Sequence, residues 1–212
     1  MKKKIVITGG LGYIGTELCK LYSGVSWHHE ITVIDNRFIS ERVNQIRNWN
    51  MEFIQGDILD LNKLTDVFNK YNPEIVFHLA AQAGVRYSIE NPKAYMDSNI
   101  IGTYNIIELG KKIKIKHLLI ASSSSVYGAN KKLPFTEIDK TETQLSLYAA
   151  TKKSTESIAH SYSNILKIPI TMLRFFTVYG PWGRPDMALF KFTKAILNND
   201  EIQFNITFYI IF

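Results

Sequence analysis

The stretch Thr8-Gly9-Gly10-Leu11-Gly12-Tyr13-Ile14-Gly15 decides how this chain folds. It follows the apolar run Lys4–Thr8 and opens a segment with helical spacing. Glycine lets a backbone turn sharply and approach a ligand closely. The start of the following helix adds free N–H groups and a positive dipole end, which suit a diphosphate. The stretch therefore predicts a strand, a tight turn and a helix that together bind a dinucleotide.

An acidic residue at the expected distance supports this interpretation. Asp35 lies twenty residues after Gly15, at the end of the apolar run Ile31–Asp35. A carboxylate at this position accepts hydrogen bonds from a ribose 2′-hydroxyl and repels a 2′-phosphate. The pattern therefore favours NAD over NADP, although Arg37 close by weakens that preference.

Apolar runs alternate with longer segments of helical spacing along most of the chain. Continuous runs of Val, Ile, Leu and Phe are typical of parallel strands covered on both faces. The alternation predicts an α/β fold, a Rossmann-like doubly wound parallel sheet with right-handed crossovers. The expected strands are Lys4–Thr8, Ile31–Asp35, Met51–Gln55, Ile75–Leu79, His117–Ser122 and Ile170–Phe175. The expected helices cover residues 12–23, 60–70, 92–114, 144–166 and 187–198.

The composition of the sequence changes after Phe176, where a loop rich in glycine and proline begins. We therefore expect an NAD-binding domain over residues 1–176 and a partial substrate-binding region over residues 177–212, which is an incomplete C-terminal substrate domain.

Composition excludes several classes of function. The net charge of +6 comes largely from lysine runs at 2–4 and 111–116, which we interpret as solvated surface. Nucleic-acid binding is not expected, because clustered arginines with interleaved aromatics are missing. A single cysteine, Cys19, and the lack of a signal peptide favour the cytoplasm, and the apolar C-terminal segment is too short to cross a membrane. The histidines lack metal-ligand spacing, so no metal is expected, and His78 is interpreted as a hydrogen-bonded core residue.

Tyr148 and Lys152 form a Tyr-x-x-x-Lys pair in the segment 144–166. Residues four apart share a face of a helix. A free phenol has a pKa near 10 and is a poor base at neutral pH, but a neighbouring ammonium and a cationic nicotinamide ring favour the phenolate. The pair therefore predicts a base for alcohol chemistry, with Lys152 also able to bind the nicotinamide ribose.

A serine cluster, Ser122-Ser123-Ser124-Ser125, ends the fifth expected strand. A hydroxyl at this edge of a parallel sheet can hydrogen-bond a substrate alcohol and help relay its proton. Ser123 is the first choice for this role and Ser124 the second, and some of the four serines only form the turn.

Two further groups have two interpretations each. Asp57 follows the third strand and can either hydrogen-bond the adenine amino group or cap the next helix. Ala80, Ala81 and Ala83 follow the fourth strand and either leave room for the cofactor or allow close packing.

Three longer motifs carry a family resemblance, namely residues 78–88, the turn 122–128 with its Val-Tyr-Gly, and residues 174–187. With them, the chain resembles the extended short-chain dehydrogenases/reductases of the nucleotide-sugar epimerase/dehydratase kind, and UDP-glucuronate 4-epimerases most closely. The resemblance implies NAD, a nucleotide-sugar substrate and, through helices 92–114 and 144–166, a homodimer. It also implies catalysis by Tyr148, Lys152 and Ser123, with Ser124 as the second choice.

The same resemblance implies the binding residues. The NAD contacts so indicated are Gly9, Gly12, Tyr13, Ile14, Gly15, Asp35, Asn36, Asp57, Ile58, Leu79, Ala80, Ala81, Ala83, Asn99, Tyr148 and Lys152. The substrate contacts so indicated are Arg86, Ser88, Ser123, Ser124, Thr177 and Arg184.

The serine turn also distinguishes reactions within this family. The 4,6-dehydratases carry an Asp-Glu pair before Val-Tyr-Gly, and the decarboxylases carry a glutamate there, whereas this chain has Ser124 and Ser125. The expected reaction is therefore redox-neutral C4 epimerisation through a 4-keto intermediate. The resemblance implies conversion of UDP-glucuronate to UDP-galacturonate, with UDP-glucose or UDP-N-acetylhexosamine as alternative substrates. Arg184 can either pair with the C6 carboxylate or form a salt bridge within its own loop.

Family members continue beyond the point at which this chain stops, and residues 202–212 depart from their pattern. We therefore expect a C-terminally truncated chain that binds NAD better than it binds substrate. The alternative function is a catalytically impaired NAD-binding remnant or an interaction protein.

Overall fold

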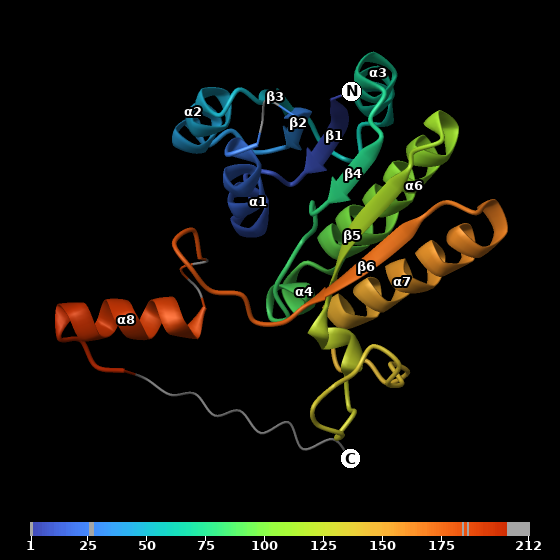
Figure 1. The fold of residues 1–212 in the computed structure, drawn as a ribbon. Helices are drawn as coiled ribbons and strands as arrows, with labels where there is room; N and C mark the ends of the chain where they lie inside the picture. Colours follow the sequence, from blue (N-terminus) through green and yellow to red (C-terminus); the bar gives the residue numbers. More distant parts are fainter. Residues whose placement is uncertain (1, 26–27, 184, 186, 203–212) are drawn as a thin grey trace. The chain divides into compact units, whose positions relative to one another are not determined.

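The structure is a computed structural model that describes residues 2–25, 28–183, 185 and 187–202. It forms two compact units, Met1–Phe176 and Thr177–Phe212. The first contains a six-stranded parallel sheet in the order β3-β2-β1-β4-β5-β6 (Figure 1). The strands are β1 Lys3–Thr8, β2 His29–Asp35, β3 Glu52–Gln55, β4 Ile75–His78, β5 His117–Ser123 and β6 Ile170–Phe175. All six expected strands are confirmed, and so is the Rossmann-like fold.

Helices connect the strands and cover both faces of the sheet. The α-helices are α1 Tyr13–Ser23, α2 Ser40–Asn48, α3 Leu61–Tyr71, α4 Tyr87–Glu90, α5 Pro92–Tyr95, α6 Gly102–Ile113, α7 Leu147–Leu166 and α8 Ala188–Asn198. A π-helical segment, η2 Met96–Ile101, joins α5 to α6, and a 3-10 turn, η3 Ser124–Tyr127, follows β5. Among the described residues, no helix is long and apolar enough to cross a membrane.

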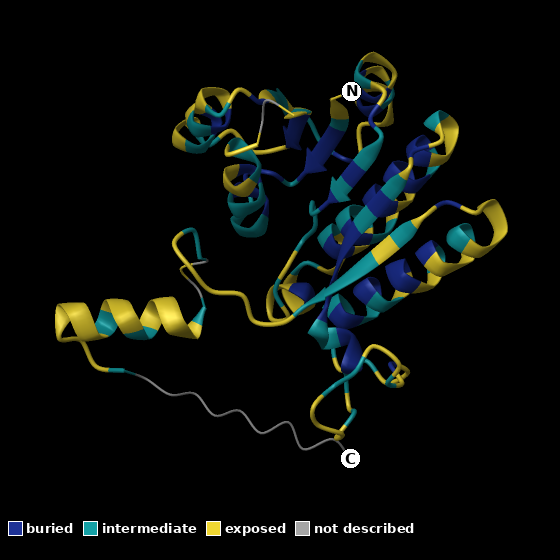
Figure 2. Cartoon of the chain, viewed as in Figure 1, coloured by how far each residue is buried: buried dark blue, intermediate teal, exposed yellow. Residues whose placement is uncertain are grey.

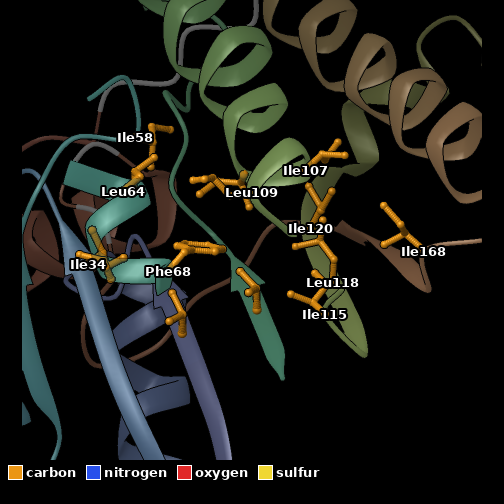
Figure 3. Packing of buried hydrophobic residues seen from close by; sticks show 14 of the residues in the cluster. Ile34, Ile58, Leu64, Phe68, Ile107, Leu109, Ile115, Leu118, Ile120 and Ile168 are labelled. Carbon is orange, nitrogen blue, oxygen red and sulfur yellow. The ribbon is translucent and has the colours of Figure 1, made fainter. Parts of the chain in front are cut away.

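Successive side chains of a strand point to opposite faces of the sheet and pack in two different hydrophobic clusters. Val6 packs in a cluster with residues of α3, α6 and α7, whereas Ile5 and Ile7 pack in the other with residues of α1 and α2. Figure 2 shows the buried residues gathered on the sheet and on the helix faces turned toward it. Figure 3 shows Phe68 of α3 and Leu109 of α6 within the first cluster. Burial on both faces explains the uninterrupted apolar runs of the central strands.

Three features of the helices differ from the expectation, and one is the short helix α4, which was not predicted. Helix α2 was not predicted, because only Val43 and Ile46 of its residues are buried and the rest of the segment is too polar to show a helical period. The expected single helix 92–114 is instead α5, the π-helical segment and α6, since a change to i→i+5 hydrogen bonds leaves no compositional mark.

The sheet order reverses direction between β1 and β4, and ligands of such sheets bind beyond the carboxyl ends of the strands at this point. His78, the last residue of β4, lies here and is fully buried. Its Nδ1 lies 2.7 Å from Thr8 Oγ1 and its Nε2 lies 3.0 Å from Thr103 Oγ1. Burial, and secondarily the charge of Lys152, lower the pKa of His78 to about 3, so the ring is neutral. The prediction of a hydrogen-bonded core histidine is confirmed.

Candidate functional site

The glycine turn after β1 is a tight cradle of backbone. Gly9 has a φ of +72°, and a Cβ added there would lie 2.5 Å from the Ala80 backbone nitrogen. A Cβ on Gly15 would lie 2.3 Å from the Gly9 carbonyl oxygen. The N-cap residue of α1 is Gly12, which has no capping side chain, and the first turn of α1 contains no acidic residue. The N-terminal amides of α1 therefore suit an anionic group such as a diphosphate.

Asp35 is buried at the end of β2 and faces this turn. Its Oδ2 accepts a hydrogen bond from the Leu11 backbone N–H at 3.0 Å. Its Oδ1 accepts from the backbone N–H and the Nε of Arg37, at 3.0 and 3.3 Å. A carboxylate offers about four acceptor positions, so the carboxylate retains capacity for a ribose hydroxyl. Arg37, which weakened the preference for NAD in the sequence, is here the ion-pair partner of Asp35.

Three other predicted NAD contacts, Asn36, Asp57 and Ile58, follow the carboxyl ends of β2 and β3. Asn36 donates through Nδ2 to Asp57 Oδ2 at 3.0 Å, and Asp57 Oδ1 accepts from the Leu59 N–H. Asp60, not Asp57, is the N-cap of α3, so the capping alternative for Asp57 was wrong. Ile58 is a core residue whose backbone carbonyl accepts a hydrogen bond from Asn105 Nδ2.

The loop after β4 is bound to the helices by Asn99. Leu79 begins the loop and donates its N–H to the Thr8 carbonyl at 3.0 Å. Further along, Asn99 accepts from the Gln82 N–H at 2.9 Å and donates both to the Gln82 carbonyl at 3.1 Å and to Thr151 Oγ1 at 3.0 Å. Asn99 is fully buried and its amide is occupied by these contacts. Its amide thus fixes the loop beside Ala80, Ala81 and Ala83 to helix α7.

Helix α7 carries the Tyr-x-x-x-Lys pair and packs against β5. Ser146 caps the helix by accepting from the Ala149 N–H at 3.1 Å, so Tyr148 lies in the first turn. The Tyr148 ring packs edge-to-face on Tyr95, with 6.0 Å between the ring centroids. Lys152 is buried, and its Nζ donates to the Ala121 carbonyl at 2.8 Å. Burial lowers the pKa of Lys152 to about 8, so the ammonium form still predominates at pH 7.

The four serines after β5 have separate roles. Ser122 donates to the Glu156 carboxylate at 2.6 Å. Ser123 accepts from the Ser125 N–H at 3.1 Å, and its Oγ also donates to Ser125 Oγ at 3.1 Å. Ser124 is half-buried in the 3-10 turn. Since α7 packs against β5 and η3, Ser123 and Ser124 lie on elements adjacent to the helix that carries Tyr148.

The other predicted substrate contacts lie on separate segments of the chain. Arg86 is exposed at the start of α4. Ser88 is buried and donates to the Val85 carbonyl at 2.6 Å, which is a structural role for its hydroxyl. Thr177 is exposed and begins the second unit, and Arg184 lies outside the described residues.

Sequence reasoning missed Glu156 and its partner Arg174. Glu156 lies four residues after Lys152, so the helical spacing that paired Tyr148 with Lys152 would have placed it on the same buried face. Its side chain is only 8 % exposed and it forms an ion pair with Arg174 of β6, with 2.9 Å between Nε and Oε1.

Comparison with known proteins identifies the family. A family model described as the NAD dependent epimerase/dehydratase family matches residues 5–208. The chain belongs to this family. Membership in the NAD-dependent epimerase/dehydratase family confirms the predicted cofactor, NAD, at the level of the family.

Two curated relatives show how much of a family member this chain represents. Protein CapI of Staphylococcus aureus is 51 % identical over 207 residues, which are 94 % of this chain and 61 % of the relative. A probable UDP-glucuronate 4-epimerase of Rhizobium meliloti (strain 1021) is 46 % identical over 211 residues, 94 % of this chain and 60 % of the relative. The chain thus spans about three fifths of the length of these epimerase/dehydratase family proteins.

Solved structures of the family share the fold. A UDP-glucuronic acid 4-epimerase from Bacillus cereus, in complex with UDP-glucuronic acid and NAD, is 36 % identical with a TM-score of 0.81, and the match covers 93 % of this chain and 64 % of that one. A UDP-glucose 4-epimerase from Thermotoga maritima, with UDP-glucose, is 30 % identical with a TM-score of 0.85, covering 94 % of this chain and 64 % of that one.

Proposed function

We propose that this chain carries the NAD-binding and proton-transfer residues of a UDP-sugar 4-epimerase, and that its substrate is a UDP-hexuronic acid, UDP-glucuronate being converted to UDP-galacturonate. The observation that carries the proposal is the buried Lys152, whose Nζ reaches the Ala121 carbonyl at the carboxyl end of β5. This end of the sheet also carries the glycine turn and Ser123, so a base, its cationic neighbour and a diphosphate cradle share one edge.

The residues present fit NAD. The turn Gly9–Gly15 leaves no room for a Cβ at its closest points, as expected where backbone must approach a diphosphate. Asp35 would accept from the adenosine ribose, and Asn36 and Asp57 would border the adenine. Tyr148 and Lys152 would border the nicotinamide ribose. When bound, NAD supplies a reversible two-electron acceptor for carbon-bound hydrogen.

The chain's own residues supply the proton chemistry. Tyr148, as a phenolate favoured by the Lys152 ammonium, accepts the proton of the substrate C4 hydroxyl and later returns it. Ser123 donates a hydrogen bond to the same oxygen, once its hydroxyl proton turns away from Ser125 Oγ. The keto sugar formed in between needs no acid or base at C5 or C6. Ser124 and Ser125 agree with this, since neither can act as the carboxylic acid or carboxylate that elimination requires.

Two of the relatives support the uronic acid as the substrate. The Rhizobium meliloti relative is named for UDP-glucuronate, and the Bacillus cereus structure contains UDP-glucuronic acid. The Thermotoga maritima structure with UDP-glucose supports a neutral hexose as the alternative. Incubation of the NAD-loaded chain with UDP-glucuronate and, separately, with UDP-glucose, followed by analysis of the sugar released from each product, tests the choice. Epimerisation of UDP-glucose alone would contradict the uronic acid proposal.

A second candidate function is NAD binding without epimerisation. Helix α8, all of which the structure describes, has no buried residue, and all five of its large apolar side chains are exposed or half-exposed. So little burial of helix α8 favours weak substrate binding. NAD binding measured by calorimetry, together with the absence of turnover on both UDP-sugars, would support this candidate.

A further inference from the structure

Glu156 is a buried residue of α7 that lies close to the candidate catalytic residues in the sequence. It lies one helical turn after Lys152 on α7, and both side chains are buried toward the sheet. The two reach neighbouring residues of β5. Lys152 Nζ donates to the Ala121 carbonyl at 2.8 Å, and Ser122 Oγ donates to Glu156 Oε1 at 2.6 Å. Helix α7 is therefore attached to β5 at two consecutive residues, directly before Ser123.

The Glu156 carboxylate also joins a third element. Arg174 of β6 donates through Nε to Oε1 and through Nη2 to Oε2, both at 2.9 Å. Paired contacts of this kind fix orientation as well as distance. Ser122 and Arg174 are opposite each other in the pairing of β5 with β6, so one carboxylate bridges both strands.

Arg174 extends the same network to the turn after β5. Its guanidinium carbon lies 5.0 Å from the centroid of the Tyr127 ring in η3, and its Nη1 donates to the Glu137 carbonyl at 3.2 Å. Lys153, on α7 itself, lies 3.7 Å from Glu156 Oε2. Burial raises the pKa of Glu156, but the hydrogen bonds from Arg174 and Ser122 outweigh it and keep the pKa below its usual range.

We propose that Glu156 is a positioning residue, which acts through Ser122 and Arg174 to keep Tyr148 and Lys152 at a fixed separation from the end of β5. The proposal rests on the proposed function, since it needs Tyr148 to act as a base beside NAD. A residue that serves stability alone would leave the ionisation of Tyr148 unchanged, whereas a positioning residue would change it, because moving Lys152 removes the charge that favours the phenolate.

The test is the ionisation of Tyr148 in the NAD-bound full chain. It is measured as the difference in ultraviolet absorbance at phenolate wavelengths between each protein and the same protein with Tyr148→Phe, across pH. Glu156→Gln keeps the size of the side chain and an acceptor for Ser122, but removes the charge opposite Arg174. We expect it to lower the fraction of phenolate at pH 7 about tenfold, with NAD affinity within about threefold of the wild type.

Glu108→Gln is the matched control, because Glu108 of α6 accepts from Tyr162 of α7 at 2.5 Å and so also joins α7 to a neighbour. It should leave the titration of Tyr148 unchanged. If Glu156→Gln fails to fold, Ser122→Ala, which removes one hydroxyl, should shift the titration in the same direction by a smaller amount.

The outcomes separate the two proposals. A wild-type chain that does not bind NAD, or binds it without a lowered phenol titration, overturns the proposed function and this inference with it. A wild-type chain with a lowered titration that Glu156→Gln leaves in place, or Ser122→Ala where Glu156→Gln does not fold, overturns the positioning role alone.

Discussion

Lys152 and Ala121 are joined by a hydrogen bond of 2.8 Å from the lysine Nζ to the backbone carbonyl, with the lysine buried between α7 and β5. One carbonyl does not replace the hydration that an ammonium has in water, and this explains the lowered pKa of Lys152.

This burial predicts a rise in stability at alkaline pH. Below pH 8 the lysine is charged in both states, and the folded state bears the full cost of burying the charge. Between about 8 and 10.5 the unfolded chain binds a proton that the folded chain has released, so the free energy of unfolding rises with pH. The rise attributable to Lys152 should reach about 3 kcal/mol. Urea unfolding at pH 7, 8, 9 and 10 measures it, and a Lys152→Met chain with the same rise would contradict it.

The buried His78 predicts a loss of stability at acidic pH. Its pKa is lowered to about 3 from an ordinary 6.5, so between these values the unfolded chain binds a proton that the folded chain does not. Stability should therefore fall as pH decreases from 6.5 toward 3, by at most roughly 5 kcal/mol. His78→Asn keeps a donor and an acceptor but cannot titrate, so its unfolding midpoints at pH 6.5 and pH 4 should lie closer together than those of the wild type. Equal spacing in both proteins would show that other groups cause the acid instability.

Removal of the Tyr148 hydroxyl should separate chemistry from cofactor binding. If the wild-type chain turns over a UDP-sugar, Tyr148→Phe should reduce kcat by about 10³-fold or more, a loss in the range of a missing general base. The NAD dissociation constant should change by less than about threefold. Tyr104→Phe, an exposed phenol on α6, is the control. Product analysis and calorimetry measure the two effects, and turnover that survives in Tyr148→Phe would exclude the proposed base.

Asp35 predicts cofactor preference. Asp35→Asn keeps an oxygen for the Leu11 N–H but loses the charge, and a hydrogen bond to a charged group contributes about 1.5–3 kcal/mol. NAD affinity should therefore fall tenfold or more, and the preference for NAD over NADP should shrink. Asp66→Asn, at an exposed position of α3, should change neither quantity. Calorimetric titration of both cofactors into the three proteins decides the outcome.

The six strands and their parallel pairing followed from the sequence because buried parallel strands leave long apolar runs. The glycine turn was equally clear, since Gly9 occupies a conformation that few other residues adopt. Helix α2 escaped prediction because it buries so little. The different roles of Ser122 and Ser123 could not be predicted from a run of four serines, since they depend on which face of β5 meets Glu156.

The ion pair between Glu156 and Arg174 could not be predicted from the sequence either. Glu156 and Arg174 are eighteen residues apart, and only the pairing of β5 with β6 under α7 brings them together. Ser88 and Ile58 show the converse, since the family resemblance implies ligand contact for each while the fold buries its side chain.

The π-helical segment Met96–Ile101 restricts how this chain can change in length. Each residue of a regular helix adds about 100° of rotation. Deleting one residue here would turn α5 against α6, so the hydroxyl of Tyr95 on the Gly84 carbonyl and the amide of Asn105 on the Ile58 carbonyl could not both be kept. Natural variants of this protein should therefore tolerate insertions and deletions in surface loops long before they tolerate a single one between residues 96 and 101.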